Sequence, residues 1–202
     1  GCVWCDTPYA KHSYNQPASD DATSREGEVT PSAVAEEVCS YHNNKVLITG
    51  GEPLLQRKEL LELVENLLSS GHIIQIETNG SIELPLIPDV HWAVDFKCPS
   101  SGVSEKMCPL TSFIKWSRYY STTPGSVCVK WVVGTPLDLD FAIERICWMR
   151  QNSYVPGLHF ISPLHGEGKQ IATMAEHIKS VDCSLLDNIV FSVQLHKWVN
   201  MP

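Results

Sequence analysis

Short apolar runs alternate along this chain with longer amphipathic segments. The runs predict strands over residues 45–49, 73–77, 90–96, 127–133, 158–161 and 189–195. Leucine and alanine spacing predicts helices that begin at Thr30-Pro31 and that cover 54–68, 139–150 and 171–181. Such alternation is typical of an α/β protein with a parallel sheet, either open or curled into an incomplete, TIM-like barrel with outer helices. Two stretches look irregular: a polar loop insertion over 11–28, and a mixed segment over 99–125 with room for short helices.

The composition fits a single domain over residues 1–202. Of these residues 43% are apolar and 19% are charged, as in an ordinary globular protein. We find no apolar stretch of about 20 residues and no signal peptide, so we expect no membrane partner. The net charge of -8 argues against a nucleic-acid partner. The eight cysteines are irregularly spaced, which favours a reducing, cytoplasmic location over a disulfide framework.

Polar clusters follow several of the predicted strands. They are GGEP at 50–53, ETNG at 77–80, DFK at 95–97 and Ser-Pro at 162–163. The carboxyl ends of parallel strands meet at one edge of a sheet, and α/β proteins keep their chemistry in the loops there. The sequence therefore predicts one active site built from these four clusters.

The amino-terminal segment Cys2-Val3-Trp4-Cys5 is a CxxC pair. By itself it is compatible with half of a zinc site, a redox dithiol, or two ligands of an iron–sulfur cluster. A second CxxC pair is absent from the sequence, and Cys98 and Cys108 lack the zinc spacing. Glu52 within GGEP is also open to two interpretations, a ligand for an ammonium group or an ordinary residue of a helix's first turn.

Taken together, the motifs resemble a known superfamily. The CxxC pair followed by DTPYA at 6–10 and by GGEP is similar to the radical S-adenosylmethionine (SAM) enzymes. Within that superfamily, ETNG, DFKCPSSG at 95–102, KWVV at 130–133 and QLHK at 194–197 resemble the 7-carboxy-7-deazaguanine synthase family. The resemblance implies a radical SAM barrel, a 4Fe–4S cluster, SAM and Mg²⁺. It also implies the reaction of a small pterin: a 5′-deoxyadenosyl radical takes hydrogen from 6-carboxy-5,6,7,8-tetrahydropterin, the ring contracts, and ammonia leaves in a step toward queuosine-type nucleosides.

The resemblance also implies roles for individual residues. Cluster ligands would be Cys2 and Cys5, and the Mg²⁺ ligand would be Thr7, whose hydroxyl suits a hard cation. SAM would contact Trp4, Asp6, Gly51, Glu52, Gly80, Asp95, Lys97, Ser162 and Pro163. Substrate would contact Thr78, His196 and the carboxylate of Pro202. Of the remaining cysteines, we expect Cys39, Cys128 and Cys147 to be buried apolar residues.

The sequence departs from the family pattern at its start. The family spacing is CxxxCxxC, and Gly1 occupies the last x of the first interval, so the first cluster cysteine and an amino-terminal strand are missing. We therefore expect that a segment precedes this sequence, and that these residues alone bind a cluster weakly or not at all. The resemblance further implies a homodimer and a reductant protein such as flavodoxin or ferredoxin. Two alternatives stay open: another radical SAM enzyme such as a glycyl-radical activase, and a non-catalytic or metal-binding relative that has lost the cluster.

Overall fold

A computed structural model describes residues 2–5, 29–152, 157–164, 168–181 and 188–193. The predicted site residues Asp6, Thr7, His196 and Pro202 lie outside these ranges, as does the loop insertion at 11–28.

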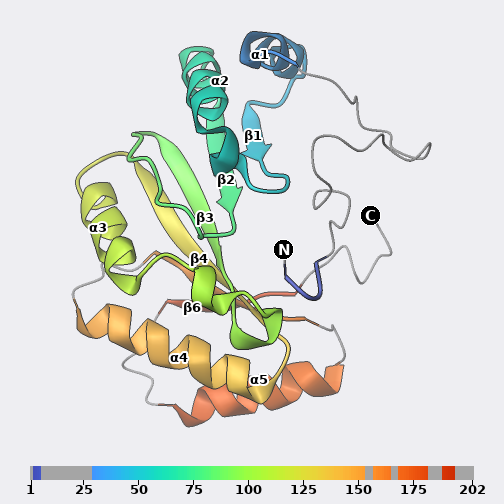
Figure 1. Cartoon of the computed structure of the whole chain (residues 1–202), viewed down its shortest axis with the longest axis vertical. Coiled ribbons are helices and arrows are strands. Elements are labelled where there is room, and N and C mark those ends of the chain that lie inside the picture. Colours follow the sequence, from blue (N-terminus) through green and yellow to red (C-terminus); the bar gives the residue numbers. More distant parts are fainter. Residues whose placement is uncertain (1, 6–28, 153–156, 165–167, 182–187, 194–202) are drawn as a thin grey trace.

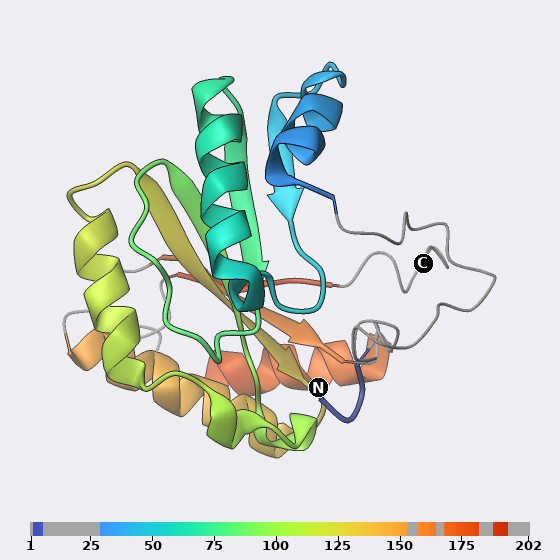
Figure 2. The ribbon, with the colours of Figure 1, turned by 45° about the horizontal axis from the view of Figure 1, so that its top comes forward.

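Six parallel strands form one sheet whose order follows the sequence, β1-β2-β3-β4-β5-β6. Their bounds are β1 Lys45–Ile48, β2 Ile73–Thr78, β3 Val90–Phe96, β4 Gly125–Val133, β5 His159–Pro163 and β6 Ile189–Phe191. Every pairing between neighbours is parallel. The sheet twists and curves without closing (Figures 1 and 2), so the expected incomplete parallel barrel is confirmed. The last strand ends at Phe191, earlier than the predicted 195.

Helices lie before β1 and in the connections between successive strands, except in the one from β2 to β3, where residues 79–89 form no helix. They are α1 Pro31–Cys39, η2 Pro53–Gln56, α2 Arg57–Ser69, η3 Pro99–Ser101, η4 Ser104–Lys106, α3 Leu110–Tyr120, α4 Pro136–Gln151 and α5 Gly168–Ser180. Thr30 caps α1 as predicted, because its hydroxyl accepts a hydrogen bond from the Ala33 N–H. Over 99–125, where the sequence leaves room for short helices, the structure has the short helices η3 and η4 and also α3, which spans eleven residues. No helix within the described ranges is long and apolar enough to cross a membrane.

The two faces of the sheet differ in chemistry because side chains alternate along each strand. One face is apolar and lies against the helices; Trp92, Trp131 and Phe96 are buried there. The Phe96 ring stacks on Trp131 with centroids 4.8 Å apart, and it contacts Phe113 of α3 at 5.5 Å. Burying each such ring stabilises the fold by roughly 1.5–3 kcal/mol. The opposite face of β2, β3 and β4 carries polar and small residues, namely Gln75, Glu77, His91, Ala93, Asp95, Ser126, Cys128 and Lys130.

The cysteines away from the amino terminus are distributed differently from the prediction. Cys39 is exposed at the end of α1, and Cys128 and Cys147 are only partly buried. Among the cysteines of this part that the structure describes, the buried ones are Cys98 and Cys108, which flank the turn after β3. Burial, together with the nearby Asp138 and Asp95, raises the pKa of the Cys98 thiol far above its ordinary range, so this thiol is inert.

Candidate functional site

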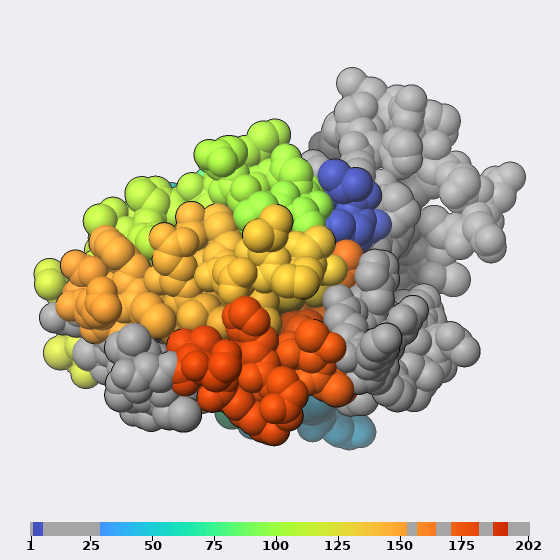
Figure 3. Space-filling view, turned by 90° about the horizontal axis from the view of Figure 1, so that it is seen from below, coloured from blue at the N-terminus to red at the C-terminus, as the bar shows by residue number. Residues whose placement is uncertain are grey.

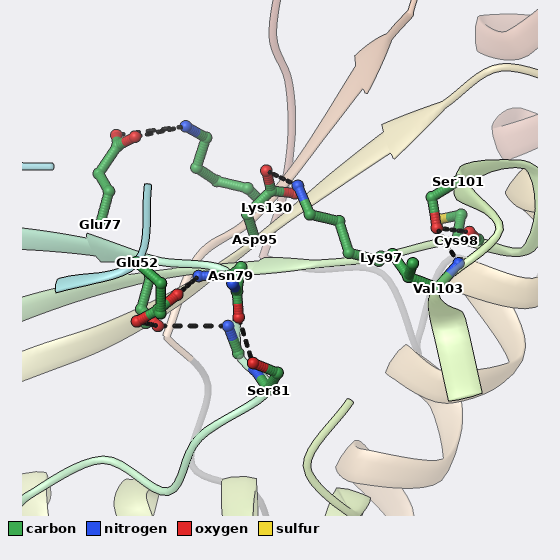
Figure 4. Close-up of polar contacts among 12 residues, drawn as sticks. Glu52, Glu77, Asn79, Ser81, Asp95, Lys97, Cys98, Ser101, Val103 and Lys130 are labelled. Carbon is green, nitrogen blue, oxygen red and sulfur yellow. Dashed lines mark hydrogen bonds and ion pairs between the residues drawn. The ribbon is translucent and has the colours of Figure 1, made fainter. Parts of the chain in front are cut away.

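The carboxylate of Glu52 joins the ends of β1 and β2. Oε1 accepts hydrogen bonds from the Thr78 hydroxyl at 2.7 Å and from the Leu54 N–H at 3.1 Å, while Oε2 accepts from the Asn79 N–H at 2.7 Å (Figure 4). The residue is 9% exposed. A carboxylate has about four acceptor positions, so these three bonds leave one position free on Oε2. Glu52 is therefore firmly placed and retains the capacity to accept from a ligand ammonium group.

Gly50 and Gly51 shape the turn that carries Glu52. Gly50 has φ +140°, a conformation that side-chain-bearing residues rarely adopt, and a Cβ there would meet nothing within 4 Å. Both glycines are exposed. The backbone of this turn is thus accessible beside Glu52, as the predicted SAM contact of Gly51 requires.

Gly80 occupies a position that permits no side chain. Its φ is +72°, and a Cβ would lie 2.6 Å from Met107 Cε and 2.7 Å from Val94 Cγ1. Asn79 shapes the same turn, since its Oδ1 accepts from the Ser81 N–H at 2.9 Å. The ETNG segment is consequently a tight turn whose conformation depends on Gly80 and Asn79.

Asp95 and Lys97 form an ion pair at the end of β3. Lys97 Nζ lies 2.6 Å from Asp95 Oδ2, and the two side chains are only 14% and 25% exposed, respectively. Asp95 Oδ1 is buried and has no hydrogen-bond partner in the described part of the chain. Lys97 Nζ also lies 5.6 Å from the centre of the Trp4 ring, within range of a cation–π interaction. Lys97 therefore connects the predicted SAM residues of β3 with the cysteine segment.

The cysteine segment, residues 2–5, is a turn held by the backbone that follows β3. The Cys5 N–H donates to the Cys2 carbonyl at 3.4 Å, the Val3 N–H donates to the Ser101 carbonyl at 3.0 Å, and Trp4 Nε1 donates to the Ser100 carbonyl at 3.2 Å. Cys2 is 8% exposed, and this burial raises its thiol pKa, opposed by the Lys97 ammonium. The fold thus brings CxxC, GGEP, ETNG and DFK to one edge of the sheet.

Some contacts at this edge differ from the sequence predictions. Ser162 and Pro163 are the last residues of β5, paired with Val132 and Val133 of β4, and do not form a loop. The polar cluster there is part of the strand because pairing with β4 extends two residues beyond the predicted end at 161.

Two groups of residues had no predicted role. Ser100 and Ser101 hold the cysteine segment through backbone carbonyls, which leave no trace in side-chain chemistry. Lys130 pairs with Glu77 at 3.1 Å across β3, on the same side of the strands as Asp95 and Lys97 (Figure 4). In the strand register Glu77 is paired with Ala93 and Lys130 with Asp95, so the lysine side chain reaches Glu77 diagonally across β3. Glu77 begins the ETNG motif and Lys130 begins the KWVV motif, so membership of these motifs was the sequence feature that could have indicated a role for the pair.

Comparison with known proteins identifies the family of this chain. Over the whole chain, the sequence is 32% identical to the 7-carboxy-7-deazaguanine synthase of Methanospirillum hungatei and spans 73% of that protein. The chain belongs to the 7-carboxy-7-deazaguanine synthase family. A second member, from Koribacter versatilis, is 37% identical over 71% of this chain and 55% of its own length. No family model matches the chain.

Structural similarity to the 7-carboxy-7-deazaguanine synthase family agrees with this placement at the level of the fold. The crystal structure of QueE from Escherichia coli superposes with a TM-score of 0.62 over 96% of this chain and 80% of that one, at 21% identity. The member from Hyperthermus butylicus is 29% identical over the full chain and 80% of its own length. The resemblance of the motifs is thereby confirmed, and the glycyl-radical activase alternative loses its support.

The family implies an iron–sulfur cluster, for which the cysteine segment offers two thiols. Cys2 and Cys5 lie on one turn, as two ligands of a shared cluster require. The described residues contain no group of three or more His, Cys, Asp and Glu side chains placed to hold a metal ion. The thiols present thus fit two ligand positions of a 7-carboxy-7-deazaguanine synthase cluster, and the described ranges do not supply a third.

Proposed function

We propose that this chain is a radical SAM lyase that converts 6-carboxy-5,6,7,8-tetrahydropterin to 7-carboxy-7-deazaguanine with loss of ammonia. Membership of the synthase family supports this reaction. The observation that carries it to this chain's own residues is the contact between Lys97 and Trp4, at 5.6 Å. This contact places the cysteine segment beside the polar end of β3, where the reaction needs cluster and nucleotide to meet.

We assign the cluster to Cys2 and Cys5, together with a further thiolate outside the described residues. When bound, the cluster and SAM supply the one-electron chemistry that begins the reaction. The protein's part is to place two thiols on one turn and to shield Cys2 from solvent. Because burial raises the pKa of Cys2, cluster binding there must displace a proton, and the nearby Lys97 favours that loss.

The SAM site in this proposal is the edge formed by Glu52, Gly51, Gly80 and the Asp95–Lys97 pair. Glu52 has a free acceptor position for an ammonium group, and its other bonds hold it in place. Asp95 Oδ1, which has no hydrogen-bond partner among the described residues, is a second acceptor at the same edge. Trp4 provides an aromatic surface beside them, while Ser162 lies at the end of β5 with 6% exposure.

The substrate and metal assignments complete the proposal. Thr78 stands at the end of β2, where its hydroxyl donates to Glu52 and its oxygen accepts from the Gly80 N–H at 3.3 Å, which leaves one acceptor position on that oxygen. His196 and Pro202 are assigned to the substrate, Asp6 to SAM, and Thr7 to Mg²⁺, all from the family motifs alone. A reductant protein such as flavodoxin or ferredoxin and a homodimeric assembly also belong to the proposal.

The test is an anaerobic assay of the full-length protein with the pterin substrate, SAM, dithionite and Mg²⁺. Cys5→Ala should abolish 5′-deoxyadenosine and product formation and lower the iron content, because a cluster ligand is lost. Cys39→Ala is the matched control, since Cys39 is exposed on α1 away from the site. A colourless protein, or one that holds zinc at Cys2 and Cys5, would overturn the proposal and favour the non-catalytic relative.

A further inference from the structure

Asp138 is a fully buried carboxylate near the start of α4. Its Oδ2 accepts from the Gly134 and Thr135 N–H groups, each at 3.0 Å, and its Oδ1 accepts from the Ser100 N–H at 2.9 Å. Burial acts to raise the pKa of this carboxyl, yet the hydrogen bonds from Ser100, Gly134 and Thr135 bring the pKa below its usual value. The group is therefore a buried anion that is stabilised by backbone donors.

The two carboxylate oxygens serve different parts of the fold. Oδ2 completes a capping box with Thr135, whose hydroxyl accepts from the Asp138 N–H in return, and so serves α4 itself. Oδ1 contacts Ser100, which lies 38 positions earlier in the chain, in the turn after β3. A helix cap does not need that second contact, so capping alone does not account for the arrangement.

Ser100 contacts both Asp138 and the cysteine segment. Its N–H donates to Asp138, and its carbonyl accepts from Trp4 Nε1 at 3.2 Å. The next carbonyl, of Ser101, accepts from the Val3 N–H at 3.0 Å. Gly102 packs closely on the same segment, since a Cβ there would lie 3.0 Å from Val3 Cγ2. In Figure 3 residues 2–5, in blue, lie directly against the green surface of the segment that follows β3.

We propose that Asp138 is a positioning residue for the cysteine segment, acting through Ser100 to fix Trp4 and the flanking thiols of Cys2 and Cys5. The geometric claim concerns the cluster-free protein; its meaning for the cluster rests on the proposed function. Without the Oδ1 contact, the turn after β3 loses its link to α4, and the segment that docks on this turn opens more often.

The discriminating variant is Asp138→Asn. An amide has one acceptor oxygen, and the orientation that keeps the two bonds from Gly134 and Thr135 turns the NH₂ group toward the Ser100 N–H. This substitution therefore breaks the Ser100 link while it retains most of the cap. Thr135→Ala is the matched opposite, because it removes the hydroxyl half of the capping box and leaves Oδ1 on Ser100. Asp140→Asn, at an exposed position of the same helix, controls for the charge change.

The readout is the alkylation rate of Cys2 in the full-length, cluster-free protein, measured by peptide mass spectrometry with exposed Cys39 as the internal reference. We expect Asp138→Asn to raise the Cys2 rate on the order of tenfold through local opening, with Thr135→Ala and Asp140→Asn within about twofold of wild type. If Asp138→Asn leaves the rate unchanged, or if Thr135→Ala raises it equally, Asp138 is only a cap and the proposal is overturned.

A second variant keeps the proposal testable if Asp138→Asn does not fold. Trp4→Phe removes the Nε1 donor together with part of the ring, leaves the capping box intact, and should also raise Cys2 alkylation. An unchanged rate would contradict the link through Ser100. Iron retention after reconstitution separates the two proposals. If Asp138→Asn raises Cys2 alkylation but the wild-type protein never binds iron, the positioning role is supported and the proposed function is contradicted. If the wild-type protein does bind iron, the Asp138→Asn variant should lose its iron faster than the wild type.

Discussion

The two faces of the sheet use the same strands for different purposes. On the face against the helices, Trp92, Phe96 and Trp131 are buried and in contact with one another or with α3 and α4. On the opposite face, the Glu77–Lys130 and Asp95–Lys97 pairs keep between 14% and 34% of their side-chain surface exposed. The difference indicates that the covered face supplies most of the stability, while the polar face and its carboxyl edge, where we propose the ligand site, contribute less to it.

The largest expected effect comes from the covered face. Trp131→Ala should lower the free energy of unfolding by about 3–5 kcal/mol, because a fully buried ring that stacks on Phe96 is replaced by a cavity. Urea denaturation followed by circular dichroism measures it. A loss below about 1 kcal/mol would mean that this face does not form the core.

His159, on the covered face, is expected to make the stability of the fold depend on pH. It is fully buried beside Trp131, whose Nε1 donates to Nδ1 at 3.2 Å. Burial, with a smaller contribution from Arg150, lowers its pKa from 6.5 to about 4. The unfolded chain therefore takes up the proton first as the pH falls. The contribution of His159 to the free energy of unfolding is therefore fully present above about pH 6.5. It is lost as the pH falls to about 4, and the total loss is about 3 kcal/mol. The unfolding free energies of the wild type and of His159→Gln, measured between about pH 6.5 and pH 4, should approach each other as the pH falls. Parallel curves would contradict the lowered pKa of His159.

Glu52 lies at the carboxyl edge of the sheet, next to the ends of β1 and β2. Glu52→Gln keeps the shape but sets an NH₂ group against one of the N–H or O–H donors, so we expect a loss of about 1–3 kcal/mol. SAM binding, measured by calorimetry on the anaerobic protein, should weaken as well. Glu62→Gln on the exposed side of α2 is the control. Retained stability with lost binding would assign Glu52 to the ligand alone.

The smallest effect is expected on the polar face. Lys130→Met removes an ion pair whose partners are 34% and 30% exposed, and such pairs contribute about 0–1 kcal/mol. The same denaturation experiment applies, with Lys115→Met, which breaks the exposed pair to Glu83, as its control. Should Lys130→Met cost more than about 2 kcal/mol, the polar face would have to be as tightly packed as the other one.

The sequence predicted the sheet well and the helices less completely. Strands were visible because their apolar runs are short and bounded by glycine or polar residues. The sequence leaves room for short helices over 99–125 but does not delimit α3, because Ser112 and Ser117 stand among its buried residues beside Phe113 and Trp116 and obscure the apolar periodicity. Helix α4 was expected to begin at Leu139, so its capping box at Thr135 and Asp138 was missed.

The candidate site was predictable where side chains carry the chemistry and not where the backbone does. Glu52, Asp95 and Lys97 were identified from motifs, and they lie at one edge of the sheet. The support of the cysteine segment was not, because it depends on carbonyls of Ser100 and Ser101 and on a tertiary contact to Asp138. Such contacts place no requirement on residue type that a single sequence reveals.

The strand order has a consequence for how the chain acquires its shape. Since each strand pairs with the one before it and the one after it, no strand has to be inserted between two that have already paired. Assembly can follow synthesis, with every new strand adding to the edge left open by its predecessor, and the loops to be closed stay short. The curved sheet that carries the candidate site can then be built progressively, one strand after another, as the polypeptide leaves the ribosome.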